Sequence, residues 1–202
     1  VQGLLFGTMA PEGALGPEAW LGRMSAPAQL LRSGIDPRFP ALEGLLRDEL
    51  AGRKTVLFTE YRETAAWLHR RLSGLPRVAL LHGSGGRTAA GPCSRPALLE
   101  RFAPEAMGGG TVPDHLRLDL LVATDVLSEG LNLQDAECVV SYDLPWNPVR
   151  LVQRSGRIDR IGSRHRSIRV VEFLPDPELD RLLRLTDRLA AKRKTIKASE
   201  GA

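Results

Sequence analysis

The stretch WNPVRLVQRSGRIDRI, residues 146–161, decides how the fold of this chain is interpreted. Asn147 can accept a hydrogen bond from a free N–H group of a first helical turn, and Pro148 suits the first helical position. The sequence therefore predicts a helix that begins here. At about 100° per residue, one face of this helix collects four arginines and a glutamine: Arg150, Gln153, Arg154, Arg157 and Arg160. The apolar side chains fall on the other face and are expected to anchor the helix.

Positive charge is concentrated around this helix. Residues 150–169 hold seven arginines and one acidic residue, a local charge of +6, whereas the whole chain carries only +4. An isolated arginine stripe is usually a solvated helix face. The concentration favours phosphate oxygens as ligands instead, because guanidinium groups bind them bidentately and stay charged.

The composition, with 43% hydrophobic and 26% charged residues in 202, is that of a soluble globular protein. No apolar run has the length of a membrane span, and no signal peptide is evident. Cys93 and Cys138 lie far apart and are interpreted as free thiols in a reducing compartment, which predicts a cytoplasmic protein. Because the first residue is Val1, we expect the chain to be part of a longer protein.

Short apolar runs alternate with helical patterns through most of the chain. Strands are predicted over residues 55–59, 77–82, 118–123, 138–142 and 168–174. Helices are predicted near residues 17–23 and over residues 40–51, 62–72, 97–102 and 177–191, besides the arginine helix. Glycines and prolines predict loops over residues 83–96 and 103–115. The alternation implies an α/β fold of three layers with a largely parallel central sheet.

This pattern divides the chain into three segments. Residues 1–39, rich in Gly, Ala and Pro, are interpreted as a connector from an upstream domain. Residues 40–176 form the α/β domain, and residues 177–202 form a C-terminal helix and a basic tail.

Polar residues stand where the predicted strands end. They are Thr59, His82, Gly83, Thr124, Asp125 and Asp143. Because ligands of parallel sheets bind at the carboxyl ends of the strands, these residues are expected to share one edge with the start of the arginine helix. In the string TDVLSEGLNLQ (residues 124–134), Gly130 leaves room for a ligand, and Asp125 and Asn132 offer groups for a ribose hydroxyl or an arginine. Alone, this string is equally compatible with an ordinary turn between a strand and a helix.

The ordered set of motifs resembles the second RecA-like domain of a superfamily-two helicase or translocase, a P-loop NTPase-type fold. Residues 124–132 resemble motif V, residues 153–160 (QRSGRIDR) motif VI, and residues 56–64 (VLFTEYRET) motif IV, while LHG at residues 81–83 resembles a weaker conserved turn. The WNP string and the trailing RIG are similar to the Swi/Snf-type branch, especially its bacterial RapA-like group. Three residues depart from the family patterns. Glu129 stands where DEAD-box proteins place an arginine, Ser163 replaces the glutamine that commonly follows RIG in the Swi/Snf branch, and Gly156 replaces an acidic residue of its eukaryotic members. The last two weaken the analogy to eukaryotic remodellers more than the translocase interpretation.

The resemblance implies roles for the matching residues. Arg157 and Arg160 become arginine fingers that reach the γ-phosphate of ATP, with Gln153 as their helper. Arg150 and Arg154 are left as salt-bridging or surface residues. On the nucleotide side, the resemblance places Gly130, Asn132 and Asp125. Contacts to the phosphate backbone of one nucleic-acid strand fall to Thr59, Arg62, His82, Gly83, Thr124 and Ser128.

The resemblance also implies a partner domain. Walker A and Walker B motifs are missing from the chain, and the string GRKT at residues 52–55 lacks the phosphate-loop spacing. ATP, with Mg²⁺ bound mainly by a first RecA-like domain of the same protein, is therefore the expected cofactor, and the segment alone is not expected to hydrolyse it. DNA is favoured over RNA as the track, and no membrane partner is expected.

One alternative stays open: a non-catalytic RecA-like module that binds nucleic acid or a protein. A Rossmann-type metabolic enzyme is disfavoured because no GxGxxG turn follows the first strand. No metal site is expected, and His69, on a predicted helix, is interpreted as solvated.

Overall fold

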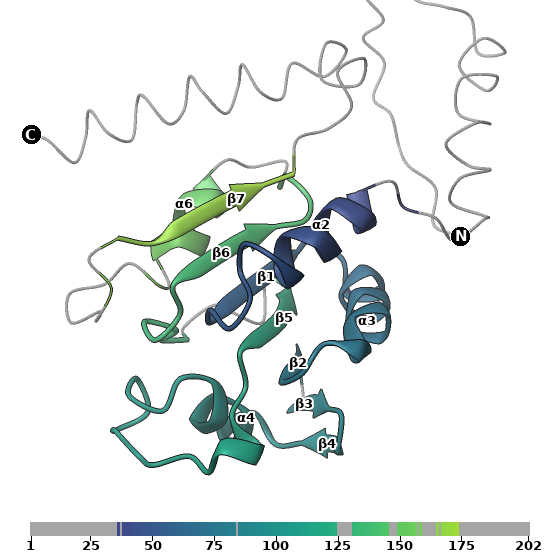
Figure 1. Cartoon of the computed structure of the whole chain (residues 1–202). Helices are drawn as coiled ribbons and strands as arrows, with labels where there is room; N and C mark the ends of the chain where they lie inside the picture. Colours follow the sequence, from purple (N-terminus) through teal and green to yellow (C-terminus); the bar gives the residue numbers. More distant parts are fainter. Residues whose placement is uncertain are drawn as a thin grey trace, which may run out of the picture. The chain divides into compact units, whose positions relative to one another are not determined.

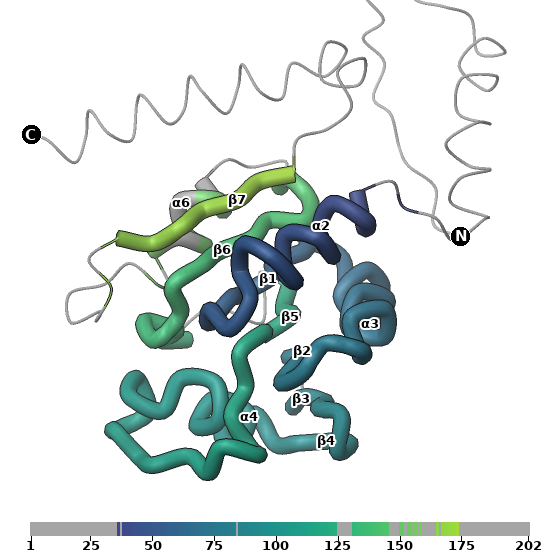
Figure 2. Tube along the Cα trace, in the orientation of Figure 1, coloured from purple at the N-terminus to yellow at the C-terminus, as the bar shows by residue number. Residues whose placement is uncertain are grey.

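The computed structural model describes residues 36, 38–83, 85–124, 131–145, 149–156, 158, 165 and 167–173. The helices predicted near residues 17–23 and over residues 177–191 lie outside this part of the chain. By its internal contacts the chain divides into two units, Val1–Leu42 and Glu43–Ala202, and helix α2 (Arg38–Arg47) runs across the division. The other described elements belong to the second unit, whose path Figure 2 traces.

A seven-stranded sheet lies at the centre of the second unit, in the order β4-β3-β2-β5-β1-β6-β7 (Figure 1). Its strands are β1 (Thr55–Thr59), β2 (Val78–His82), β3 (Gly85–Thr88), β4 (Gly91–Cys93), β5 (Leu120–Thr124), β6 (Cys138–Ser141) and β7 (Arg169–Glu172). The pairs β2–β5, β5–β1, β1–β6 and β6–β7 are parallel, whereas β3 pairs antiparallel with both β2 and β4. The predicted α/β fold with a largely parallel sheet is confirmed.

The parallel strands form where the sequence has its short apolar runs. Every residue of β1 and β5 is buried, because a parallel sheet is covered on both faces and its strands cannot alternate polar with apolar residues. In the register of the sheet, Thr59 lies beside Thr124 and Phe58 beside Ser141. Strands β1, β5 and β6 therefore end at nearly the same level.

Helices cover both faces of this sheet. On one face, alternate strand residues such as Phe58 and Leu81 form one apolar core with α4 (Arg95–Phe102) and with residues 131–136. Ile158, which lies two residues beyond α6 (Val149–Gly156), also belongs to this core. Helix α3 (Arg62–Arg71), continued by a short 3-10 helix (Leu72–Gly74), contacts β1, β2 and β5 with buried residues outside that core. It covers the opposite face.

The loop predicted over residues 83–96 is wrong in its central part, which forms the hairpin β3–β4. Gly86 lies so close to α4 that an added Cβ would stand 2.1 Å from Leu98 Cδ1, and Gly91 has a φ of +116° after the turn. Glycine therefore permits close packing and an unusual backbone angle here, which local composition cannot distinguish from a loop. Helix α4 also begins earlier than predicted, because Ser94 Oγ caps it by accepting from the Ala97 N–H.

His69 contradicts the sequence interpretation, because α3 buries it. Burial, and secondarily the charge of Arg87, lower the pKa of its imidazole below the ordinary value of 6.5.

Cys93 and Cys138 are free thiols, and burial raises the pKa of Cys138. None of the described helices is long and apolar enough to cross a membrane. Within the same residues, no group of three or more His, Cys, Asp or Glu side chains is arranged to hold a metal.

Candidate functional site

The carboxyl edge of the parallel strands gathers polar residues. Thr59, His82 and Thr124 are the last residues of β1, β2 and β5. Asp143 follows β6 by two residues, and α6 begins at Val149. The arrangement places the helix with the motif VI-like sequence beside the ends of β6 and β1.

Asp143 is the centre of a hydrogen-bonded network at this edge. Its Oδ2 accepts from the Thr59 hydroxyl at 2.5 Å, and its Oδ1 accepts from the backbone N–H of Glu60 at 2.8 Å. The Tyr142 N–H donates to the carbonyl oxygen of Phe58 just before. One carboxylate thereby continues the connection between β6 and β1 beyond their last paired residues.

Arg154 reaches the same carboxylate from α6. Its Nη1 donates to the Asp143 carbonyl oxygen at 3.1 Å, and its Nη2 lies 3.7 Å from Asp143 Oδ1. The guanidinium also stands 5.5 Å from the centre of the Phe58 ring. The side chain is only 2% exposed, so these partners offset the desolvation of a buried charge. The predicted salt bridge of Arg154 is present, but the residue does not lie on the surface.

A second, more exposed ion pair joins α6 to the end of β1. Arg150 Nη1 lies 3.4 Å from Glu60 Oε1, and both side chains are partly exposed. Gln153, on the same helix, is exposed. The predicted arginine face is therefore divided: one arginine is buried, one is paired at the rim, and the glutamine is open to solvent.

The other residues predicted from the sequence lie in varied environments. Thr59 and Thr124 are 0% and 6% exposed, whereas Arg62 and Gly83 are exposed at the surface. His82 is partly exposed, and its Nδ1 is buried without a hydrogen-bond partner among the described residues. Asn132 Oδ1 accepts from the Gln134 N–H at 3.3 Å, a local turn contact. Asp125, Ser128, Gly130, Arg157 and Arg160 lie outside the described residues.

Sequence reasoning missed the role of Asp143 in this edge. The string DLPWNP placed it after a strand, but nothing in the local pattern indicated that it joins Thr59, Glu60 and Arg154. An acidic residue at the end of a buried strand, upstream of an arginine-rich helix, was the available signal.

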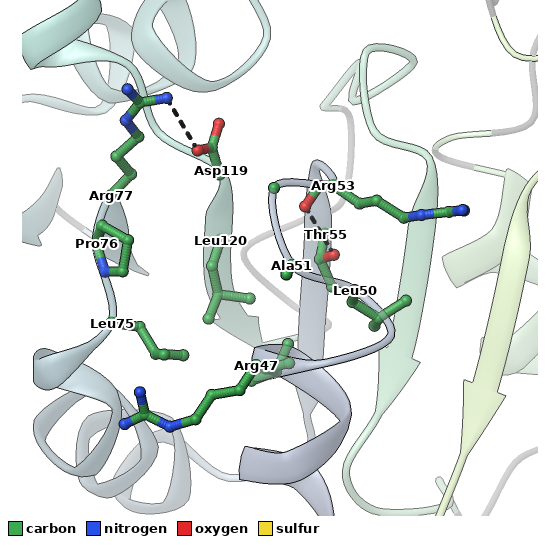
Figure 3. Close-up of a pocket in the computed structure, with 12 residues that line it drawn as sticks. Arg47, Leu50, Ala51, Arg53, Thr55, Leu75, Pro76, Arg77, Asp119 and Leu120 are labelled. Atoms are coloured by element: carbon green, nitrogen blue, oxygen red, sulfur yellow. Dashed lines mark hydrogen bonds and ion pairs between the residues drawn. The ribbon is translucent and has the colours of Figure 1, made fainter.

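A pocket of about 520 Å³ lies at the opposite, amino edge of the sheet (Figure 3). Thr55 and Leu120, the first residues of β1 and β5, line it. On its wall Arg77 turns toward Asp119, its ion-pair partner at 3.3 Å, and Arg53 extends away from the space (Figure 3). None of the described residues predicted to bind nucleotide or nucleic acid lines this pocket, so it is separate from the carboxyl-edge site.

A three-layer α/β domain with a mostly parallel sheet, carrying an arginine-bearing helix at its carboxyl edge, is a RecA-like domain. The chain belongs to the family described as the helicase conserved C-terminal domain, whose model matches residues 38–162.

Curated relatives are similar over part of their length. The chain is 52% identical over 112 residues to an uncharacterized ATP-dependent helicase, YqhH, of Bacillus subtilis, covering 54% of this chain and 17% of the relative. It is 32% identical to the ATP-dependent RNA helicase DBP8 of Debaryomyces hansenii, covering 68% and 27% respectively. For the RNA polymerase-associated protein RapA of Pseudomonas putida, identity is 31%, covering 73% and 14%. The chain thus spans less than a third of these relatives.

Solved structures share the fold. The C-terminal part of the Fun30 ATPase domain matches with a TM-score of 0.54 at 18% identity, covering 75% of this chain and 42% of that one. The C-terminal domain of the DEAD-box protein Dbp5 matches with a TM-score of 0.51 at 24% identity, covering 70% and 72%.

Proposed function

We propose that this chain is the second RecA-like domain of an ATP-driven motor that moves on nucleic acid in the cytoplasm. It supplies motifs IV, V and VI to an ATPase site that a first RecA-like domain of the same protein completes. That first domain holds ATP and most of the Mg²⁺ ligands. In this proposal residues 1–39 connect the two domains, and residues 177–202 follow the motor domain in the chain.

The observation that carries this proposal is the placement of α6. The helix with the motif VI-like sequence is fixed at the carboxyl edge through Asp143 and Arg154, where ligands of parallel sheets bind. The finger candidates Arg157 and Arg160 follow α6 directly in sequence. In this proposal they neutralise charge that develops on the transferred phosphoryl group, with Gln153 assisting. In the same proposal, the nucleotide-binding site includes Gly130, Asn132 and Asp125.

The proposed track is a phosphate backbone held at the same edge. Arg62 and Gly83 are exposed and His82 is partly exposed, and we assign the contacts to these residues and to Ser128. Thr59 and Thr124 are left out of the proposed contacts because their side chains are buried. The WNP and RIG strings favour the RapA-like branch, and on this ground we propose DNA as the track. Identity to relatives does not separate the branches, because it is 31% for RapA and 32% for the RNA helicase DBP8.

Substitution of one finger tests the proposal. In the full-length protein, Arg157→Ala is expected to lower nucleic-acid-stimulated ATP turnover by about 10³-fold or more and to leave ATP binding near the wild-type value. Arg47→Ala, which removes a surface ion pair with Glu43, serves as the control and keeps its turnover. Normal turnover of the Arg157 variant would refute the finger assignment, and stimulation by single-stranded RNA but not by duplex DNA would refute the proposed track.

A further inference from the structure

Asp143 joins three separate parts of the carboxyl edge through one side chain and its own carbonyl group. Its carboxylate accepts from Thr59 and from the Glu60 N–H, at the corner that follows β1. On the other side it faces the guanidinium of Arg154 on α6. The corner after β1 and the helix α6 are therefore not attached independently to the sheet, because both are attached to Asp143.

The guanidinium of Arg154 is buried against other protein groups and is therefore not exposed to bind a phosphate. Its side chain is 2% exposed, its Nη1 donates to the Asp143 carbonyl oxygen, and its guanidinium lies over the Phe58 ring. The planar fork of an arginine suits two simultaneous contacts of this kind, whereas a lysine ammonium offers a single point charge. These contacts fix both the position of α6 along β6 and its rotation about its own axis.

We propose that Asp143 and Arg154 form a positioning pair, which sets where α6 presents the finger arginines that follow it in sequence. Neither residue of the pair touches ATP in this scheme; both act through α6. Asp143 also accepts hydrogen bonds from Thr59 and from the Glu60 N–H. The pair therefore connects α6 to residues 56–64, the segment that resembles motif IV. This inference rests on the proposed function, since it assigns a role in ATP turnover to residues that would otherwise be structural.

The pair is tested in the full-length protein by steady-state ATP turnover with duplex DNA and, in parallel, with single-stranded RNA. Arg154→Met keeps an apolar stem and removes the fork. Asp143→Asn keeps one acceptor oxygen, replaces the other with an NH₂ donor and removes the charge. Each is expected to lower kcat on the order of 100-fold, because a misplacement of about 1 Å has that effect on a reacting group. The KM for ATP is expected to stay near the wild-type value, because the first domain binds the nucleotide.

Three further variants separate positioning from folding. The double variant Asp143→Asn with Arg154→Met is expected to be no slower than the slower single variant, because the two residues act as a unit. Arg154→Lys keeps the buried charge and is expected to fold, with an intermediate kcat, so it carries the test if Arg154→Met does not fold. Arg169→Met is the control. Arg169 lies on the edge strand β7 and forms an ion pair with Glu49, and its replacement is expected to leave kcat unchanged.

The outcomes distinguish this inference from the function on which it rests. If Arg157→Ala is inactive while Arg154→Met or Arg154→Lys turns over ATP at the wild-type kcat, the positioning pair is refuted and the proposed function stands. If Arg157→Ala turns over normally, the finger assignment in the proposed function fails, and the positioning pair has no finger to position. If kcat falls in the Arg154 variants only together with an equal rise in KM, the residue shapes nucleotide binding, and positioning of the fingers is also refuted.

Discussion

The packing of the hairpin β3–β4 on α4 makes Gly86→Ala a sharp test of the fold. A Cβ at residue 86 would stand 2.1 Å from Leu98 Cδ1 and 2.7 Å from the carbonyl oxygen of Leu80. Leu98 is a completely buried side chain of α4. The contacted Leu80 oxygen is a backbone atom of β2, the strand that pairs with β3. Rotation of the leucine can relieve the first contact, but the second requires β3 to move away from β2.

The destabilisation follows from these two contacts. An extra methyl group in a well-packed core raises the free energy of the native state by about 1–3 kcal/mol, and the contact with a backbone atom places this site near the upper value. In a protein of this size about 3 kcal/mol lowers the Tm by roughly 6–12 °C. Urea and thermal unfolding followed by circular dichroism measure both quantities.

Gly44→Ala provides a control of opposite sign. Gly44 lies within α2 with no atom within 4 Å of an added Cβ, so alanine is expected to stabilise the helix by up to about 1 kcal/mol. If Gly86→Ala unfolds at the wild-type Tm and urea midpoint, the close approach of β3 to α4 is wrong. Combining Gly86→Ala with Leu98→Ala is expected to be less destabilising than the sum of the two single variants, because the smaller side chain removes the 2.1 Å contact.

Two further predictions concern titratable side chains, His69, which is buried, and Lys54, which is partly buried. The pKa of His69 is lowered by burial and by the charge of Arg87. The imidazole of His69 therefore binds a proton more readily in the unfolded chain than in the folded chain. Stability is therefore expected to fall as the pH decreases through 6.5, and His69→Gln is expected to lose this dependence in urea unfolding compared between about pH 7.5 and pH 5.5. Lys54 Nζ donates to the carbonyl oxygens of Phe102, at the end of α4, and of Leu118. Lys54→Met keeps the apolar stem and is expected to lower the free energy of unfolding by about 1–3 kcal/mol, whereas an unchanged urea midpoint would show that these contacts add no stability.

The sequence predicts the parallel sheet well because its strands are buried on both faces. Runs such as residues 55–59 (TVLFT) and 138–142 (CVVSY) carry no charged residue and are apolar except for two threonines and a serine, which is typical of a strand covered by helices. The polar residues that follow such runs mark the carboxyl edge, since parallel strands all end on the same side. Thr59, Thr124 and Asp143 could therefore be assigned to one edge without knowledge of the contacts between them.

The hairpin β3–β4 could not be predicted in the same way. The sequence GGRT has weak strand propensity, and it becomes a strand because Gly86 fits against α4 while β3 pairs with β2. Both conditions depend on segments that are brought together only by the fold. A glycine-rich stretch thus carries the same local signal whether it forms a loop or a closely packed edge strand.

Arg154 illustrates why a helical wheel misjudges a charged face. The wheel groups Arg154 with Arg150, yet Arg150 pairs at the rim with Glu60 while Arg154 is buried over Phe58. Burial of an arginine is tolerated only where partners replace its water. Here those partners are Asp143, which follows β6, and Phe58, near the carboxyl end of β1. Sequence periodicity has no information about such distant partners, so it assigns every charge to the outside. In the proposed scheme Arg154 therefore holds α6 in place and does not contact a phosphate, whereas Gln153 on the same helix is exposed to solvent.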